Sequence, residues 1–182
     1  MKKRFIYILA ALGLVLSACG NDAAGETDAH EDEPSHEGHD HAAPAEREVK
    51  EGQTVLPNGD LQEVTASAEE LPSFLDDKPE DMQLVYQVAG SATEILEWMP
   101  CYCGCGDSAG HKSNMNCFIS EVREDGSVVW DDHGTRCLVC LEIAVESVKM
   151  AQDGKSLKEI RETIDETYNE GYAEPTPTPM PA

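Results

Sequence analysis

The stretch Pro100-Cys101-Tyr102-Cys103-Gly104-Cys105-Gly106 decides how this chain is organised, because it places three cysteines at alternate positions. Its two glycines allow the backbone to turn tightly between the thiols. The other thiols of this region, and the two imidazoles that lie between them, follow closely: His111, Cys117, His133, Cys137 and Cys140. Six thiols and two imidazoles therefore fall within one short part of the chain.

This pattern predicts a metal site. Alternating cysteines on a glycine-containing loop can direct several sulfur atoms at one centre, and Cys137 and Cys140 share one face of a predicted helix. Soft sulfur ligands select copper(I), zinc or iron–sulfur clusters, and an exported chain would have to acquire a cluster outside the cell. We therefore predict a copper or zinc site without catalytic turnover. The predicted ligands are Cys101, Cys103, Cys105, Cys117, Cys137, Cys140, His111 and His133.

Two other kinds of chemistry are open to the same six thiols. Exported domains often carry disulfides, and the cysteines after residue 100 are even in number. The triplet Cys101 to Cys105 could pair without strain only with distant partners, however. Cys137-Leu138-Val139-Cys140 has the spacing of a thiol–disulfide redox motif at a helix start, where a thiolate is favoured. The alternatives are thus a surface redox protein and a disulfide-stapled interaction module.

Residues 1–18 have the pattern of an export signal. Basic residues at positions 2–4 precede an apolar run from Phe5 to Leu16, which is too short to span a bilayer stably. The run ends in Leu16-Ser17-Ala18-Cys19, which is similar to the lipobox of bacterial lipoproteins. The implied modification is a diacylglycerol on Cys19. We therefore expect a lipid-anchored protein on the outer face of the cell membrane.

The charge of the chain restricts its partners. The formal net charge is −23 at pH 7, and it becomes −26 when the signal leaves with its three positive charges. Such a balance repels nucleic acid and anionic lipid and attracts cations. The expected partners are the membrane, through the lipid anchor, a metal ion, and a protein that donates or accepts that ion. We expect no nucleic-acid partner.

Residues 19–66 have the composition of a disordered tether behind the lipidated cysteine. The segment is rich in Ala, Glu, Asp and Gly and shows no sustained apolar period, so it could not bury enough surface to order itself. Four histidines alternate with acidic residues in it and could capture metal weakly: His30, His36, His39 and His41. A solvated spacer is the other interpretation of the same stretch.

From Ser67 the spacing of apolar residues becomes helical, and we expect the folded domain to span residues 67–172. Ser-x-x-Glu sequences, which cap the starts of helices, begin at Ser67, Ser91 and Ser156. Two further helices are predicted over about 79–90 and 136–152, and two short strands, a single hairpin, around residues 124–127. The expected fold class is therefore mainly α: a small helical domain with a Cys-rich loop and one hairpin. The Pro/Thr-rich tail, residues 173–182, is expected to be extended and disordered.

The hexapeptide Pro100 to Cys105 resembles the hallmark of the PCYCGC-motif lipoproteins of Gram-positive bacteria. The similarity extends through Gly110-His111-Lys112-Ser113, through Cys117-Phe118, and through His133-Gly134 to the Cys-x-x-Cys pair. It covers about residues 67–181. The resemblance implies the same location, anchored by lipid to the outer face of the membrane, and an intact set of cysteines. It implies no activity, because none is established for the family.

Overall fold

The computed structural model describes residues 48–182 of the 182-residue chain. The expected signal peptide (1–18), the lipidation site Cys19 and most of the tether therefore lie outside the described residues. The same is true of the four tether histidines, His30, His36, His39 and His41.

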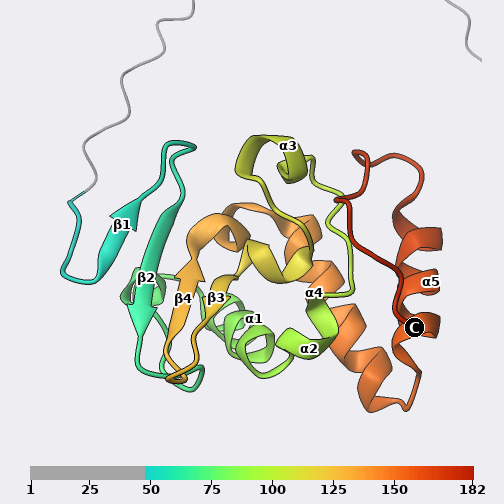
Figure 1. Cartoon of the computed structure of the whole chain (residues 1–182), viewed down its shortest axis with the longest axis horizontal. Helices are drawn as coiled ribbons and strands as arrows, with labels where there is room; N and C mark the ends of the chain where they lie inside the picture. Colours follow the sequence, from blue (N-terminus) through green and yellow to red (C-terminus); the bar gives the residue numbers. More distant parts are fainter. Residues whose placement is uncertain (1–47) are drawn as a thin grey trace, which may run out of the picture. The chain divides into compact units, whose positions relative to one another are not determined.

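A four-stranded antiparallel sheet forms one layer of the fold, with the strand order β1-β2-β4-β3 (Figure 1). Its strands are β1 (Gln53–Val55), β2 (Leu61–Thr65), β3 (Ile119–Val122) and β4 (Val128–Asp131). All four residues of β4 are buried, and β4 pairs with β2 on one side and with β3 on the other. The predicted hairpin is therefore correct, but it is only half of the sheet.

The expectation of a mainly α fold is wrong, because this sheet makes the fold a mixed α/β one. β1 and β2 lie within the segment that was expected to be a disordered tether. Both strands are short and partly polar, so their local pattern is weak. What holds β2 in the sheet is its pairing with a strand far along the chain, with Glu63 opposite Trp130. Local periodicity cannot reveal a pairing of that kind.

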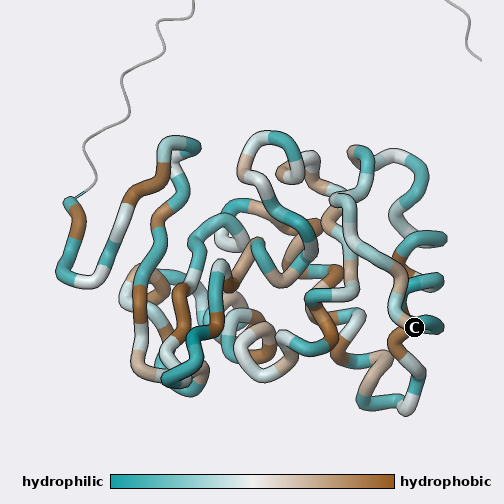
Figure 2. The backbone as a smooth tube through the Cα atoms, in the orientation of Figure 1, coloured by the Kyte–Doolittle hydropathy of each residue, from teal (hydrophilic) through white to brown (hydrophobic). Residues whose placement is uncertain are grey.

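The helices predicted after residue 78 are present. They are α1 (Glu80–Ser91), α2 (Thr93–Leu96), α4 (Leu138–Gln152) and α5 (Leu157–Tyr168). α4 packs between α1 and α5, and Figure 2 shows α5 hydrophilic along the side turned away from α4. No helix among residues 48–182 is long and apolar enough to cross a membrane.

Only one of the three predicted capping boxes forms. The Ser156 hydroxyl accepts a hydrogen bond from the backbone of Glu159, whose carboxylate accepts one in return at the start of α5. The stretch after Ser67 forms turns and a short 3-10 helix (Ser73–Leu75), and α2 begins at Thr93, where the N-cap residue Ala92 provides no side-chain cap. A capping sequence alone does not decide where a helix starts, because tertiary packing overrides it.

The tail is extended as predicted, but the expectation that it is disordered is wrong. Thr176 donates its backbone N–H to the carbonyl of Cys101 and accepts the N–H of Cys101 on its hydroxyl, at 3.0 and 2.9 Å. The guanidinium of Arg161 donates to the carbonyls of Thr178 and Pro179. The tail thus satisfies buried backbone groups of the cysteine loop, a role that its composition does not indicate.

The cysteines are part of the main hydrophobic core. Trp130, Tyr86 and Phe118 are fully buried and belong to the same cluster as four of the six thiols that follow residue 100, and the other two, Cys103 and Cys137, pack at its edge. The indole of Trp130 donates to the hydroxyl of Thr65 on β2 at 2.8 Å. Trp130 is therefore a packing residue that links the sheet to this core.

Candidate metal centre

The six predicted cysteines converge in space. The sulfur of Cys101 lies 3.1 Å from that of Cys103 and 3.3 Å from that of Cys140. Cys140 in turn lies 3.7 Å from Cys103 and 2.6 Å from Cys137, again between sulfur atoms. Cys105 and Cys117 belong to further groups of three potential ligand residues. Within each group, the ligand atoms all lie within 4.8 Å of one another. All six of these cysteines are free.

Most of these separations suit a shared ion, and the exception is the 2.6 Å between Cys137 and Cys140. Two thiolates on one tetrahedral zinc, each about 2.3 Å from it, stand about 3.8 Å apart. The separation of Cys103 and Cys140 is close to that value, and those of Cys101 from Cys103 and Cys140 are somewhat shorter. Small movements of the side chains would therefore allow three or four sulfurs to bind one centre, with the others bridging to a neighbouring ion.

Four separate elements deliver the thiols. Cys101 and Cys103 lie on the loop after α2, and Cys105 opens a short helix, α3 (Cys105–Ala109), where a plain loop was expected. Gly104 permits this because it adopts a positive φ of 82°, which side chains rarely tolerate. Cys117 ends the 3-10 helix Asn114–Cys117. Cys137 caps α4, and its sulfur accepts the backbone N–H of Cys140 in the first turn.

Gly134 allows the second half of the site to approach the first. A Cβ atom at this position would lie 2.7 Å from the ring of Phe118 and 3.0 Å from the carbonyl of Cys117. Those contacts are too short for any other residue without a shift of the backbone. The absence of a side chain therefore keeps the turn before Cys137 close to Cys117.

Both predicted histidines reach the cluster. Nδ1 of His111 lies 3.6 Å from the sulfur of Cys117, and Nε2 of His133 lies 3.9 Å from the sulfur of Cys103. The two rings are 4.7 Å apart and nearly perpendicular. His111 is buried and His133 is half-buried. The structure thus brings together every ligand that the sequence predicts between Cys101 and Cys140.

Asp60 is the residue of this site that the sequence did not indicate. Its carboxylate lies 3.2 Å from Nδ1 of His133 and forms an ion pair with Arg136, which also pairs with Asp132. Asp60, His111 and His133 form a further triplet of potential ligand atoms. Asp60 lies in a segment that was expected to be a disordered tether. A carboxylate on one imidazole nitrogen fixes which nitrogen faces the metal.

Hydrogen bonds within the cluster separate the pKa values of its groups. The Cys101 thiol lowers the pKa of Cys103 and that of Cys105, the latter to about 4, and these contacts raise the pKa of Cys101 itself. Cys103 and Cys105, followed by Asp60, raise the pKa of His133 to about 10. The site thus concentrates negative charge on sulfur beside a protonated imidazole. A bound cation would displace that proton and take over its role in balancing the thiolates.

We predict that Asp60→Asn weakens Zn²⁺ binding by about 10- to 100-fold, because His133 loses the carboxylate that orients it. Competition against a chromogenic chelator would measure the dissociation constant. Arg136→Gln is the matched control, since it removes the ion pair but leaves the carboxylate beside His133. Equal affinities for wild type and Asp60→Asn would show that the carboxylate has no such role.

The fold and the site define a small α/β protein with a buried cluster of six cysteines and two histidines. The chain belongs to the family of proteins of unknown function with a PCYCGC motif, whose profile matches residues 8–181. The resemblance seen in the sequence is thereby confirmed, and it extends further toward the N-terminus than expected. No curated protein and no solved structure matches the chain.

Proposed function

We propose that this protein binds a thiophilic metal ion, copper or zinc, through its Cys/His cluster and serves in metal buffering, sensing or delivery. A lipid on Cys19 would hold it at the outer face of the cell membrane. The observation that carries the proposal is the convergence of six free thiols and two imidazoles from separate elements. Structural packing alone does not require six thiols and two imidazoles to face one another.

The donor set favours soft or borderline ions. Thiolates select copper(I) and zinc over the hard cations that prefer carboxylates. Zinc would take four of the ligands in a closed tetrahedron, whereas copper(I) accepts two or three sulfurs and allows bridging. Six thiolates with bridging sulfurs could hold about four copper(I) ions.

The burial of the cluster supports binding without turnover. Cys101, Cys117 and Cys140 are each 0% exposed, and the tail covers the backbone of Cys101. An organic substrate would have no path to these sulfurs, whereas an ion could pass from the half-exposed Cys103 and Cys137. The acidic chain, at −23, would attract such cations.

One observation favours thiol–disulfide exchange as a second candidate function. The sulfurs of Cys137 and Cys140 are the closest pair in the cluster, at 2.6 Å, and they lie at the start of α4. A disulfide between them would need only a small approach. This reaction would require an external oxidant or a partner disulfide, and the pair would have to leave any metal that it binds.

A native mass spectrum of the full chain, taken without reductant or chelator, tests the proposal. We expect an integral number of copper or zinc ions and no loss of hydrogen beyond the protons that the bound ions displace, so that no disulfide is present. Elemental analysis of the same sample identifies the ion. Three disulfides without metal would instead favour the stapled interaction module, and a single disulfide without metal would favour redox chemistry at Cys137 and Cys140.

A further inference from the structure

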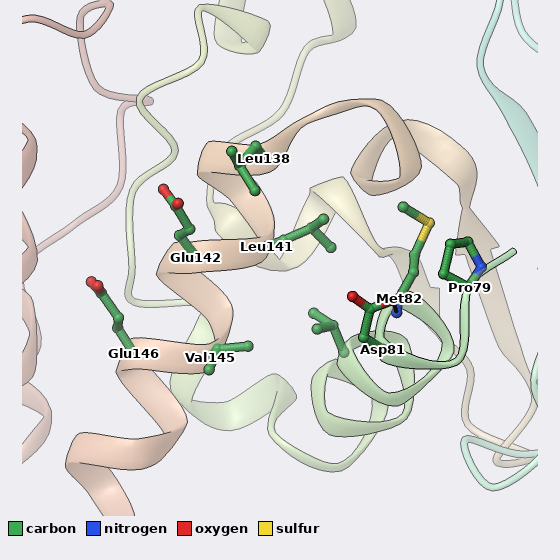
Figure 3. A pocket seen from close by; sticks show the side chains of 9 residues that line it. Pro79, Asp81, Met82, Leu138, Leu141, Glu142, Val145 and Glu146 are labelled. Atoms are coloured by element: carbon green, nitrogen blue, oxygen red, sulfur yellow. Dashed lines mark hydrogen bonds between the residues drawn. The ribbon is translucent and has the colours of Figure 1, made fainter.

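An apolar groove of about 510 Å³ lies between α1 and the first half of α4 (Figure 3). Met82 and Val85 line it from α1, and Leu138, Leu141 and Val145 line it from α4. In Figure 3 the side chains of Leu141, Val145 and Met82 point into the space between the two helices. Three acidic residues, Asp81, Glu142 and Glu146, lie at its edge, and in Figure 3 the carboxylates of Glu142 and Glu146 point outward, to the side of α4 away from α1.

The groove leaves large apolar side chains in water. Leu138 is 68% exposed and Val145 is 44% exposed, although both belong to a helix whose other face is fully buried. Neighbouring exposed apolar residues with a polar rim are typical of an interaction site, whereas single exposed ones are common everywhere. The groove is therefore a surface where another molecule could bind.

Its position connects it to the thiols. Leu138 directly follows Cys137, and Leu141 directly follows Cys140, so the groove and the metal centre share the first turn of α4. Leu141 also packs against the same core cluster as the cysteines. Cys137 is one of the two half-exposed thiols. A molecule seated in the groove would thus lie beside a sulfur that can be reached from solvent.

Charge decides what kind of molecule fits. The chain's own residues 19–47 carry nine acidic side chains and one arginine, so the carboxylate rim would repel them. A second copy of a chain with a net charge of −23 is disfavoured for the same reason, and so is anionic lipid. An apolar floor with an acidic rim is complementary to an amphipathic helix that carries apolar residues between lysines or arginines.

We propose that this groove docks a basic amphipathic segment of the protein that exchanges metal with the cluster. The inference rests on the proposed function, because it names the kind of partner that function requires. Exchange would proceed by ligand substitution: each thiolate of the partner forms one bond to the ion as one bond to Cys137 or a neighbouring cysteine breaks. The oxidation state of the ion does not change, and docking brings the two sets of thiolates together.

The test uses the full chain in phosphatidylcholine vesicles and a synthetic helical peptide with leucines on one face and lysines on the other. Carboxylates are labelled with a carbodiimide and glycine ethyl ester, with and without peptide, and read by mass spectrometry. We expect the peptide to reduce labelling of Glu142 and Glu146 at least threefold. Labelling of Glu124, in the turn between β3 and β4, should not change. A peptide with glutamates in place of the lysines should protect neither site.

Two matched variants decide the outcome. Leu138→Ser should remove the protection, whereas Leu84→Ser should keep it, since Leu84 is also an exposed leucine, at 58%, but does not line the groove. Protection that survives Leu138→Ser, or that the acidic peptide gives equally, would overturn the proposal. The metal content of each variant is measured in parallel. Docking without bound metal would contradict the proposed function alone, and full metal content without docking would contradict the groove alone.

A second form of the peptide, ending in a Cys-x-x-Cys sequence, tests exchange itself. We expect it to take Zn²⁺ from the loaded wild-type chain at least tenfold faster than from Leu138→Ser. The Leu84→Ser chain should behave as wild type. Equal rates for all three chains would show that the groove does not assist exchange.

Discussion

Cys103→Ser is expected to lower the affinity of the chain for Zn²⁺ or copper(I) by more than about 100-fold and to reduce the number of bound ions. Cys103 is the thiol that joins the parts of the site, because its sulfur faces Cys101, Cys140 and His133. Serine keeps the volume but replaces a soft thiolate with a hydroxyl that binds these ions poorly. The position is half-buried, so the substitution should leave the fold intact. Native mass spectrometry gives the stoichiometry, and chelator competition gives the affinity.

Cys19→Ser is the matched control, because it makes the same replacement at the one cysteine outside the motif region. It should keep the metal and lose the membrane anchor, so that the chain leaves the membrane fraction. Circular dichroism of Cys103→Ser would exclude unfolding as the cause of a loss. Full stoichiometry and unchanged affinity in Cys103→Ser would contradict the proposal that the cluster binds a metal ion.

The convergence of the thiols could be predicted because short-range patterns encode most of it. Alternate cysteines on a glycine-containing loop and two cysteines three apart at a helix start each limit where a sulfur can point. The link between them also depends on the buried turn at Gly134 and on the packing of Phe118, which the sequence does not show. The histidines were placed correctly because they are the only ones of the folded part and both lie between cysteines.

Asp60 and the strands around it could not be predicted, because their structure depends on distant partners. Asp60 acquires its role only when β2 pairs with β4, which places it beside His133 and Arg136. The tail was misjudged for a related reason. Its prolines and threonines are typical of disordered segments, yet Thr176 forms hydrogen bonds with both backbone groups of Cys101. Composition indicates whether a segment can fold in isolation. The strands β1 and β2 and the C-terminal tail are ordered by their contacts with distant parts of the chain.

Trp130→Ala is expected to lower the free energy of unfolding by about 3–5 kcal/mol and the midpoint of thermal unfolding by about 10–20 °C. The indole is fully buried, and it packs so closely on α1 that a Cβ atom at Gly90 would lie 2.7 Å from it. It also donates a hydrogen bond to the hydroxyl of Thr65, so its loss removes the packing of β4 on α1 and a side-chain hydrogen bond between β4 and β2. Urea and thermal unfolding with excess chelator measure the effect. Trp98→Ala, at a partly buried tryptophan outside this contact, should cost clearly less.

A bound metal ion should restore part of the free energy of unfolding that Trp130→Ala removes, because the ligands from four elements come together only in the folded chain. An ion at 100 times its dissociation constant adds about 2.7 kcal/mol to the folded state, if the unfolded chain does not bind it. The Cys-x-Cys-x-Cys triplet could hold some metal when unfolded, so the measured gain should be smaller than that value. A double variant, Trp130→Ala with Cys103→Ser, should lose the gain. If zinc raised the unfolding midpoint of the double variant as much as that of Trp130→Ala, the ion would be stabilising the chain from somewhere other than the cluster.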